Sequence, residues 1–555
     1  MSEYPTARLS IEAGNPKTDP STKSRDYFAM SPYWDKVDAI LGGKDAIQAA
    51  GELYLPRFQE EASTTDSMGR TYDPYTIRLQ RSPFTNLYED IARNLSAKPF
   101  AKELTMKGDT PEPYQELADN LDNQGRSLHV FGQEVFKAGV NYAISWIMVD
   151  FTRATPRADG IPLTKADETA QNLRPYWVHV FATRMLAVYS DYEDGVEIIT
   201  HARIYEPGIT LNGYLEQPVQ RVRVLDREPI LFDEAGKPIK WGPPTYRVWE
   251  LVVGAVSAAT GMSSTWEAVE EGTYVGIDVI PLVPFITGDR QPGSYIVKPP
   301  LQGLVNQQIE EYNLESALQN TLDLTCFPML VGSGVNPPDS GAKLAVGPRT
   351  IFYAPPTQAG GRPGDYKFIE PAATSVKVVM EKLDKTRTEM RDLGMMPLTQ
   401  TNLTVITTGQ VAVKANSSVQ AWAIRFADAL EQAWKLTAQW MGDVNFEPEV
   451  LVYKDFAAYL DGGVGFAGVM QLRTNKDISG EAAVDAAMRY GYLPDDFNYE
   501  EDQKLVADEQ QGLQAEQTIN PLTGLPINMT PLKPGQALPQ PKPKPGKPPP
   551  PPTVQ

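Results

Sequence analysis

Cysteine and histidine are scarce in this chain of 555 residues. The single cysteine, Cys326, excludes an internal disulfide, and only three histidines accompany it, which disfavours a Cys/His zinc site. Because Cys326 stands next to Phe327 in an apolar stretch, a small buried hydrophobe is the better interpretation than a reactive thiol. We therefore expect neither a metal site nor a catalytic cysteine.

Long apolar runs are also missing. No run of about 18 apolar residues exists, and the first residues lack the basic and then apolar order of a signal peptide. Hydrophobic residues make up 41% of the chain and charged residues 22%, as in globular proteins. We expect a soluble protein that is made in the cytoplasm and has no membrane partner, with about two to four structural regions.

Basic residues are outnumbered, with 51 Lys and Arg against 70 Asp and Glu and a net charge of −19. Since nucleic-acid-binding surfaces gain affinity by neutralising phosphates, this balance argues against a protein that wraps nucleic acid. Residues 299–342 contain no lysine or arginine, although they contain several carboxylates. Two interpretations stay open: an ordinary solvated helix face, or a surface that lets a polyanion pass without holding it.

Signatures of common enzymes are absent from the sequence. It contains no Gly-x-x-x-x-Gly-Lys-Ser/Thr loop, no Gly-x-Ser-x-Gly elbow and no His-Glu-x-x-His pair. Residues 463–468 satisfy a bare Gly-x-Gly-x-x-Gly pattern, but no parallel βαβ unit is predicted around them. Asp191 and Asp194 fit a turn better than a calcium loop, whose alternating acidic positions are missing. No carboxylate pair stands out as an acid/base couple, so we predict no enzyme, no cofactor and no catalytic residue.

Three long helical patterns follow Pro299. They cover residues 299–325, 372–393 and 408–441, and at about 1.5 Å per residue they would be roughly 35, 35 and 50 Å long. Residues 326–371, between the first two patterns, contain two apolar extended pieces among Gly and Pro and predict a small projecting β module. Long helices without a recognisable set of catalytic residues are typical of a structural protein whose helices line or support a larger assembly.

The first half of the chain predicts helices followed by strands. Residues 1–29 are polar and turn-rich and indicate a loose arm. Ser31-Pro32 and Ser82-Pro83 each look like an N-cap followed by proline at the first helical position, and each predicts a helix start. A third helix is predicted at 113–140. The strands that we predict cover 144–149, 176–190, 196–205, 221–225, 246–253 and 274–279.

The last hundred residues change in character. Residues 455–500 predict short helices, one of them starting at Ser479-Gly480-Glu481. Residues 531–555 contain 11 prolines in 25 residues, which predicts an extended tail without a core of its own.

The order of these parts resembles that of bacteriophage portal proteins, the connectors at the DNA-entry vertex of tailed-phage capsids. The resemblance covers about residues 30–500 and lies in layout more than in invariant motifs. The segments that carry it begin at Ser31-Pro-Tyr-Trp, Leu53-Tyr-Leu-Pro, Pro299-Pro-Leu-Gln, Phe327-Pro-Met-Leu and Arg391-Asp-Leu-Gly.

The resemblance implies a portal-like α+β fold with long stem and wing helices, which forms rings, usually of twelve subunits, around a tunnel. It assigns a flexible arm (1–29), a wing (30–298, β-rich over 176–283), a stem helix (299–325), a clip (326–371), a second stem helix (372–393), a tunnel loop (394–407), a long wing helix and connection (408–454), a crown-like helical region (455–512) and a Pro-rich disordered tail (513–555).

The resemblance also implies the function of a structural portal, whose channel serves genome packaging and ejection. The implied partners are other copies of the chain, double-stranded DNA, the terminase large subunit, a head-tail adaptor, and the major capsid and scaffold proteins. The implied location is the portal vertex of the virion, after synthesis in the host cytoplasm. The alternative is another virion structural protein, such as a tail or baseplate component, and a nucleotide-binding enzyme is the more remote one.

Two groups of residues are the candidate site. The first is the tunnel loop, in which proline prevents a simple helix continuation and uncharged polar residues offer hydrogen bonds to DNA; its methionines and leucine have an alternative role as a hydrophobic plug. This loop comprises Gly394, Met395, Met396, Pro397, Leu398, Thr399, Gln400, Thr401 and Asn402.

The second group is the charge of the two stem helices. In a ring, its carboxylates would form negative bands that repel phosphates, while its basic residues would make limited DNA contacts or ion pairs between subunits; exposed helical charge without a role is the alternative. The group comprises Glu310, Glu311, Glu315, Lys377, Lys382, Lys385, Arg387 and Arg391.

Overall fold

A computed structural model describes residues 18–59, 61–65, 71–107, 110–155, 170–253, 264–325, 329–333, 351–354, 365–369, 374–394, 405–443, 445–454, 464–489 and 502–507, with a few single positions between them. The chain divides into two compact units, Met1–Ala457 and Ala458–Gln555. Helices and strands are mixed in the first unit, so the α+β expectation is confirmed.

The first unit begins with helices whose starts differ from the predicted ones. The Ser24 hydroxyl accepts a hydrogen bond from the Tyr27 N–H at 3.1 Å and caps α1, so this helix begins within the predicted arm and contains Pro32. Met30 and Trp34, on either side of the proline, are both buried, and this packing holds the helix together. The N-terminal helices are α1 (Arg25–Leu41), α2 (Gly43–Ala49), η1 (Gly51–Leu53), α3 (Pro74–Arg81), α4 (Leu87–Ala97), η2 (Lys98–Phe100), α5 (Glu112–Asp119) and α6 (Leu128–Tyr142).

Two further predictions about these helices are wrong. Ser82 ends α3 instead of starting a helix, because its hydroxyl donates to the Arg78 carbonyl, and Asn86 caps α4. The predicted helix at 113–140 is interrupted because Asn123 and Gly125 have positive φ values of 63° and 89°, which no helix accommodates.

Two antiparallel sheets form the β-rich part. A three-stranded sheet has the order β15–β4–β5, and a five-stranded sheet has the order β14–β13–β10–β7–β6. The strands are β4 (Ile144–Phe151), β5 (Pro175–Phe181), β6 (Met185–Glu193), β7 (Val196–Tyr205), β10 (Arg221–Asp226), β13 (Thr245–Val253), β14 (Ser264–Thr273) and β15 (Leu282–Ile286).

The predicted strand at 176–190 is two strands, since a short 3-10 turn (η3, Ala182–Arg184) carries the chain from one sheet to the other. Residues 274–279 are not a strand; Gly276, with a φ of 91°, lies in this connection. Asp194 and Gly195 have φ values of 51° and 82° between β6 and β7, so the turn interpretation is confirmed. Among the described residues, no cluster of His, Cys, Asp and Glu could hold a metal ion.

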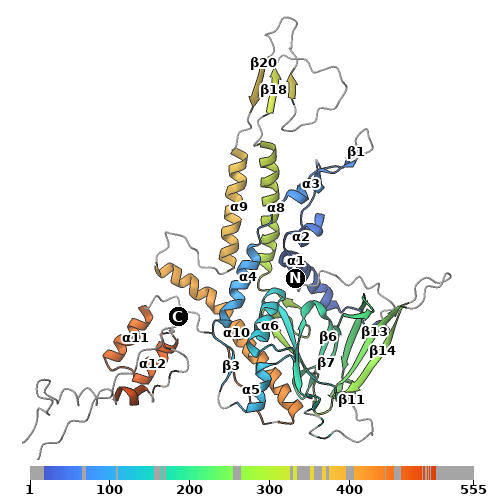
Figure 1. Ribbon diagram of the computed structural model, residues 1–555, viewed down its shortest axis with the longest axis vertical. Coiled ribbons are helices and arrows are strands. Elements are labelled where there is room, and N and C mark those ends of the chain that lie inside the picture. Colours follow the sequence, from blue (N-terminus) through green and yellow to red (C-terminus); the bar gives the residue numbers. More distant parts are fainter. Residues whose placement is uncertain are drawn as a thin grey trace, which may run out of the picture. The chain divides into compact units, whose positions relative to one another are not determined.

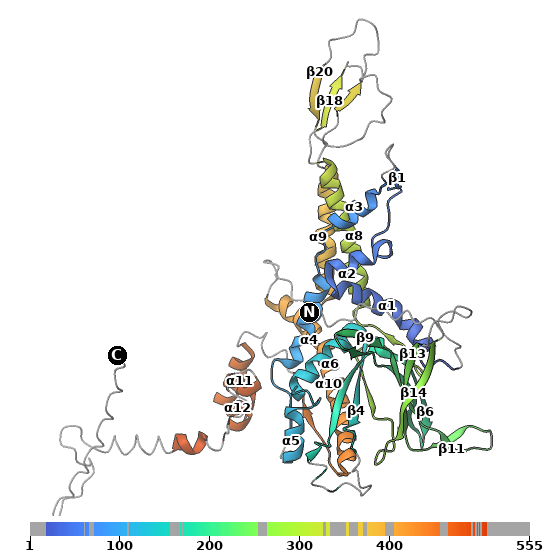
Figure 2. The ribbon, with the colours of Figure 1, turned by 45° about the vertical axis from the view of Figure 1, so that its right-hand side comes forward.

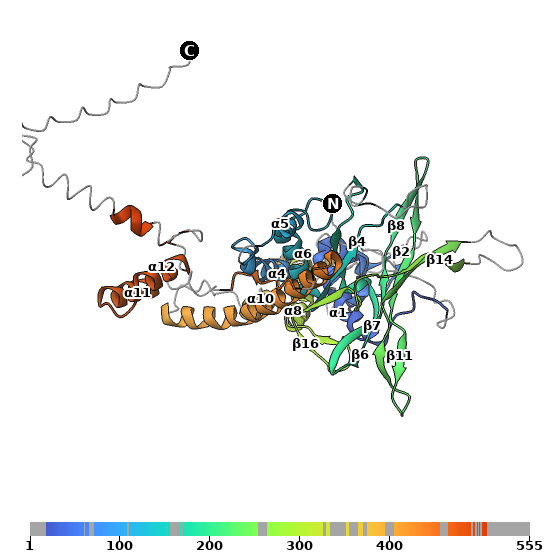
Figure 3. The ribbon, with the colours of Figure 1, turned by 90° about the horizontal axis from the view of Figure 1, so that it is seen from below.

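Shorter pairs complete the β structure. Two hairpins, β8 (Gly208–Asn212) with β9 (Leu215–Val219) and β11 (Pro229–Phe232) with β12 (Pro238–Trp241), carry exposed apolar residues and extend from the five-stranded sheet (Figure 3). The other pairs are β1 (Thr64–Thr65) with β2 (Thr71–Tyr72), β3 (Thr105–Met106) with β21 (Val450–Leu451), and β16 (Asp289–Arg290) with β17 (Val297–Lys298).

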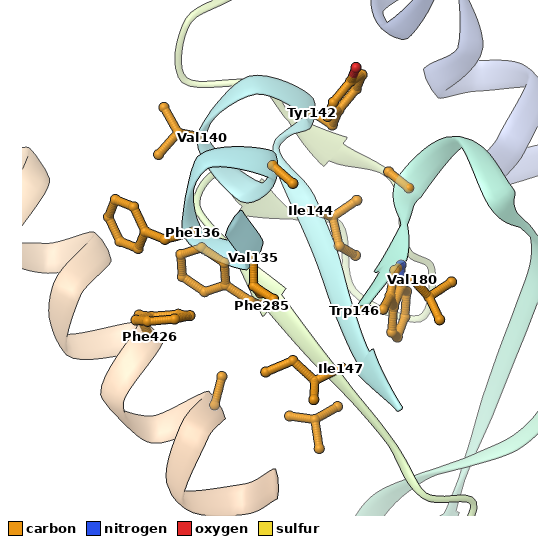
Figure 4. Close-up of a cluster of buried hydrophobic side chains, with 14 of the residues drawn as sticks. Val135, Phe136, Val140, Tyr142, Ile144, Trp146, Ile147, Val180, Phe285 and Phe426 are labelled. Atoms are coloured by element: carbon orange, nitrogen blue, oxygen red, sulfur yellow. The ribbon is translucent and has the colours of Figure 1, made fainter. Parts of the chain in front are cut away.

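The core lies between the three-stranded sheet and helices α6 and α10. Phe136, Phe285 and Phe426 meet there, with ring centroids 4.9 to 5.4 Å apart (Figure 4). Gly139 lets α6 approach the sheet, since a Cβ at this position would stand 2.4 Å from the Phe285 ring. Strand β4 is buried on both faces, which explains its nearly continuous apolar sequence.

Three long helices confirm the predicted patterns: α8 (Gln302–Thr325), α9 (Thr374–Leu393) and α10 (Val405–Met441). By the rise of an α-helix they are about 36, 30 and 56 Å long. Helices α8 and α9 lie side by side, and a three-stranded sheet is inserted between them in the chain (Figures 1 and 2). In this sheet β18 (Met329–Ser333) is central, parallel to β19 (Ile351–Ala354) and antiparallel to β20 (Asp365–Ile369), a strand that was not predicted.

The second unit contains a helix pair, α11 (Val464–Thr474) and α12 (Gly480–Arg489). Residues 464–468 of the Gly-x-Gly-x-x-Gly pattern lie in α11, so they do not form a phosphate-binding turn. The Ser479 hydroxyl accepts from the Ala482 N–H, which confirms the predicted helix start. In the described parts of both units, no helix is long and apolar enough to span a membrane.

Candidate functional site

Three side chains are hydrogen-bonded in the sequence Ser–His–carboxylate, as in a catalytic triad, but the serine is not accessible to a substrate. The Ser145 hydroxyl lies 2.8 Å from His179 Nε2, and His179 Nδ1 lies 3.1 Å from Glu134. Ser145 has no exposed surface, and burial lowers the pKa of His179 despite its hydrogen bond to Glu134. A nucleophile must reach its substrate, so we interpret the three residues as a link between β4, β5 and α6. The sequence carries no signal for this link, because neighbouring strands bring distant residues together.

The pair of α8 and α9 is the main candidate site. It is antiparallel, and Leu383 and Met390 of α9 are buried, while Tyr312 of α8 is buried against the N-terminal helical segment, in a cluster with Ile47 and Tyr75. At the start of α8, Leu304 and Val305 join the main core of the first unit. The pair is therefore fixed to the rest of the unit at one end.

A buried group of charges joins the two helices. The Arg387 guanidinium of α9 donates to Glu311 of α8 at 2.7 and 2.9 Å and also contacts the Glu315 carboxylate. Glu311 has no exposed surface, and the Glu315 side chain is 9% exposed. Gln308 donates to Glu311 at 3.2 Å, and Thr85 donates to Glu315 at 2.8 Å. One guanidinium thus holds two carboxylates out of water.

A second buried ion pair fixes the outer side of α8. Arg78 of α3 donates to both oxygens of Glu61, at 2.6 and 2.8 Å, and both side chains are buried. The same guanidinium donates to the Ser316 hydroxyl of α8 at 3.0 Å, and Ser82 donates to that hydroxyl at 2.7 Å. The segment around α3 therefore covers the face of α8 that α9 leaves open.

These contacts correct part of the predicted site. Glu311 and Glu315 are buried and paired within the chain, because α9 and the segment around Thr85 cover them, so they cannot form an exposed band. Glu310 is half exposed and pairs with Lys382 at 3.0 Å. Arg387 thus pairs with Glu311 and Glu315, and Lys382 pairs with Glu310.

The other predicted basic residues stay on the outside. Lys377, Lys385 and Arg391 are exposed on α9, and Lys385 lies 3.8 Å from Glu389 of the same helix. Of the predicted tunnel loop, the structure describes Gly394; residues 395–402 lie outside the described residues, as do Cys326 and the tail from residue 513. The role of the loop stays a prediction.

Gly394 is needed for close packing. A Cβ at this position would stand 2.3 Å from Cγ2 of Ile91, a buried residue of α4. We expect Gly394→Ala to lower the free energy of unfolding by about 1–3 kcal/mol, since a packed core resists an added methyl group. Urea denaturation monitored by tryptophan fluorescence measures this loss.

The matched control for this substitution is Gly303→Ala in α8. Its Cβ would meet only Leu393, at an ordinary 3.9 Å, so the substitution should be neutral or stabilise the helix by up to about 1 kcal/mol. Equal effects of the two substitutions would contradict the close-packing role of Gly394.

Glu311 should make stability depend on pH. Burial and then the Glu315 carboxylate raise the pKa of Glu311 from 4.5 to about 7, although Arg387 opposes them. The folded state therefore holds this proton more tightly than the unfolded state, so the stabilisation is full below about pH 4.5 and is lost as the pH rises through about 7. Glu311→Gln should flatten the unfolding free energy between about pH 5 and 8 relative to the unchanged chain. Parallel pH profiles in urea denaturation would refute this assignment.

Comparisons with known proteins give one family model and several structures. The model described as "Domain of unknown function (DUF4055)" matches residues 300–441, which span α8, the inserted sheet, α9 and α10. No curated protein sequence matches the chain.

Three of the similar solved structures are parts of gene transfer agent (GTA) particles. "Neck of empty GTA particle computed with C6 symmetry" has 11% identity and a TM-score of 0.36, covering 73% of this chain and 89% of its own. "Virion of native gene transfer agent (GTA) particle" has 12% identity and a TM-score of 0.35, covering 83% and 97%. "Neck of native GTA particle computed with C12 symmetry" has 12% identity and a TM-score of 0.36, covering 80% and 99%. With TM-scores this low, the likeness alone assigns no function to the chain.

Proposed function

We propose that the chain is the subunit of a portal, a ring at one vertex of a phage-like capsid through which double-stranded DNA is packaged and ejected. The observation that carries this proposal is the α8–α9 pair. It is a long antiparallel pair held by buried ion pairs, with a small sheet inserted between its helices and the 37-residue helix α10 after it. In the proposed ring the pair is the stem, the inserted sheet is the clip and α10 spans the wing.

The charge of the pair fits a channel that does not retain DNA. Helix α8 contains no lysine or arginine, and its exposed side offers Gln302, Asn306 and the half-exposed Glu310. Helix α9 exposes basic and acidic residues together, so opposite charges are available for contacts between neighbouring subunits. Helix α8 itself adds no cation to this surface, and the neighbouring Lys382 is paired with Glu310, so the surface gains little of the affinity that phosphate neutralisation supplies, and DNA can slide past it.

The partners that we propose follow from this role. They are other copies of the chain, the DNA in the channel, the terminase large subunit, a head-tail adaptor, and the major capsid and scaffold proteins. The location is the portal vertex of the virion. The alternative is a tail or baseplate component, and the test has to distinguish it from a portal.

Negative-stain electron microscopy of the full chain tests the ring. We expect closed rings with a central channel, with the chain alone or with its scaffold protein present during expression. Monomers in both preparations, over a wide range of concentration and salt, would reject the portal. Closed rings that fail to support DNA packaging in a complementation assay would favour the tail or baseplate alternative.

The predicted tunnel loop gives a test of the channel itself. Replacing Thr399, Gln400, Thr401 and Asn402 by Gly and Ser should leave the rings intact and lower the amount of packaged or retained DNA. Unchanged packaging, or failure of the ring to assemble, would reject a role of this loop in facing DNA.

A further inference from the structure

A cavity of about 200 Å³ lies at the junction of the two large sheets and the end of α10. Its lining comes from five separate parts of the chain: the end of β4 with Arg153 after it, the middle of β10, the start of β13, the end of β14 with the two residues after it, and Trp440 of α10. It opens to the surface beside Arg153, Thr273 and Val275, all of which are exposed. A ligand can therefore enter from solvent.

Aromatic rings form the walls of this cavity. The rings of Phe151 and Trp440 have centroids 5.3 Å apart, those of Trp440 and Tyr274 are 5.6 Å apart, and those of Tyr274 and Tyr246 are 5.1 Å apart. These four rings come from β4, α10, the segment after β14 and β13. These rings pack against one another at tilted and edge-to-face angles, and the parts of them that line the cavity offer apolar surface to an aromatic group.

The polar part of the cavity is Arg223, whose positive charge is balanced by two carboxylates. Arg223 donates from Nε to Glu206 at 2.7 Å and from Nη1 to Asp150 at 2.9 Å. Asp150 also accepts from the Phe151 N–H and from the Tyr176 hydroxyl. Two carboxylates already surround Arg223, and Arg153 at the opening of the cavity is paired with Glu270, so the site offers no net positive charge to an anion. Neither of these hydrogen bonds uses the second terminal nitrogen, Nη2, whose two N–H groups lie beside the Tyr274 hydroxyl and supply the donor for a ligand.

Tyr274 is the second donor. Its side chain is more than nine-tenths buried, and its hydroxyl has no hydrogen-bond partner among the described residues. Neighbouring Arg223 cannot accept a hydrogen bond, so it cannot satisfy the phenol O–H. A buried donor without an acceptor costs about 1–3 kcal/mol, and a ligand that supplies the acceptor recovers this cost.

We propose that this cavity binds an aromatic amino-acid residue whose carbonyl oxygen accepts hydrogen bonds from Tyr274 and Arg223. The four rings receive the flat side chain, and the two donors fix the carbonyl. A neutral acceptor fits better than a carboxylate because Asp150 and Glu206 already balance Arg223. The volume suits one residue, below the roughly 300 Å³ at which pockets for larger ligands begin. This site is independent of the proposed function.

The test uses the full chain and N-acetyl-L-tryptophanamide as the probe, with saturation-transfer NMR as the readout. We expect saturable binding that Tyr274→Phe weakens about tenfold, the factor for one lost hydrogen bond of about 1.4 kcal/mol. Tyr312→Phe is the matched control. It removes another buried phenol without a hydrogen-bond partner, far from this cavity's lining, and should leave binding unchanged. Indole, which lacks a carbonyl, should bind more weakly and be indifferent to Tyr274→Phe.

The peptide Ala-Ala-Trp-Ala-Ala separates two sources of the ligand. Tighter binding of this peptide than of the amide would identify a protein segment, and its exclusion with retained amide binding would identify a free small molecule. Cavity water is the competing occupant, since the volume holds about six molecules at roughly 30 Å³ each. The proposal is overturned if no probe binds, if Tyr274→Phe leaves binding unchanged, or if this substitution lowers the melting temperature by several degrees. The last result would show that the phenol is already satisfied.

Discussion

Replacing Arg387 by methionine is expected to lower the free energy of unfolding by about 3–5 kcal/mol, the usual cost of breaking a buried ion pair from one side. Methionine keeps much of the apolar stem but leaves Glu311 and Glu315 facing each other without a cation. Two buried carboxylates then have to take up protons or become hydrated, and either process opens the contact between α8 and α9. Urea denaturation at about pH 7.5 measures the loss, since Glu311 is then mostly ionised.

Two variants make this result specific. Lys385→Met removes an exposed cation two positions away that lies 3.8 Å from Glu389, and it should change stability little. Adding Glu311→Gln and Glu315→Gln to Arg387→Met should recover a large part of the loss, because no buried charge is left unpaired. A loss in Arg387→Met no larger than in Lys385→Met would show that water reaches the carboxylates.

Glu310 and Glu311 show where sequence reasoning ends. The apolar spacing predicted helix α8 to within a few residues, because a 24-residue helix carries many repeats of the pattern. The apolar spacing does not distinguish two adjacent carboxylates. Because a helix turns about 100° per residue, however, their side chains face different directions. Glu311 is buried against Arg387, 76 positions away in the chain, while Glu310 stays half exposed. Only the tertiary contact decides which carboxylate is available to solvent.

The helix starts were missed for a related reason. Ser-Pro at positions 31–32 and 82–83 satisfies a local rule for helix starts, but other caps compete with it. Ser24 caps α1 earlier, and Asn86 caps α4 later. Capping contributes about 1 kcal/mol, which burial of Trp34 or Tyr88 easily exceeds. The aromatic cavity and the Ser145–His179–Glu134 link were not predictable, since each joins residues from separate strands.

Replacing Arg78 by methionine is the second substitution with a large expected effect, again about 3–5 kcal/mol. Arg78 makes four kinds of contact at once: the buried Glu61 carboxylate, the Pro56 carbonyl at 2.7 Å, the Ser316 hydroxyl, and the ring of Phe58, 4.1 Å away. Methionine would remove the cation beside Glu61, which keeps only the Phe58 N–H among the described donors, and would leave the Pro56 carbonyl without the Arg78 donor. Helix α3 should then separate from α8, so hydrogen exchange should increase in both helices together.

Arg81, one turn later in α3, is the matched control. Its guanidinium lies 3.4 Å from Asp323 of α8, but its side chain is 65% exposed, so Arg81→Met should cost at most about 1 kcal/mol. The difference between the stability losses of Arg78→Met and Arg81→Met measures the effect of burial, because both arginines belong to α3 and both contact α8. Faster exchange confined to α3 would contradict the prediction, since α8 would then be held by Arg387 and its core residues alone. Faster exchange in both helices would show that α8 depends on ion pairs on two of its sides, as a strut between a rigid body and an inserted sheet requires.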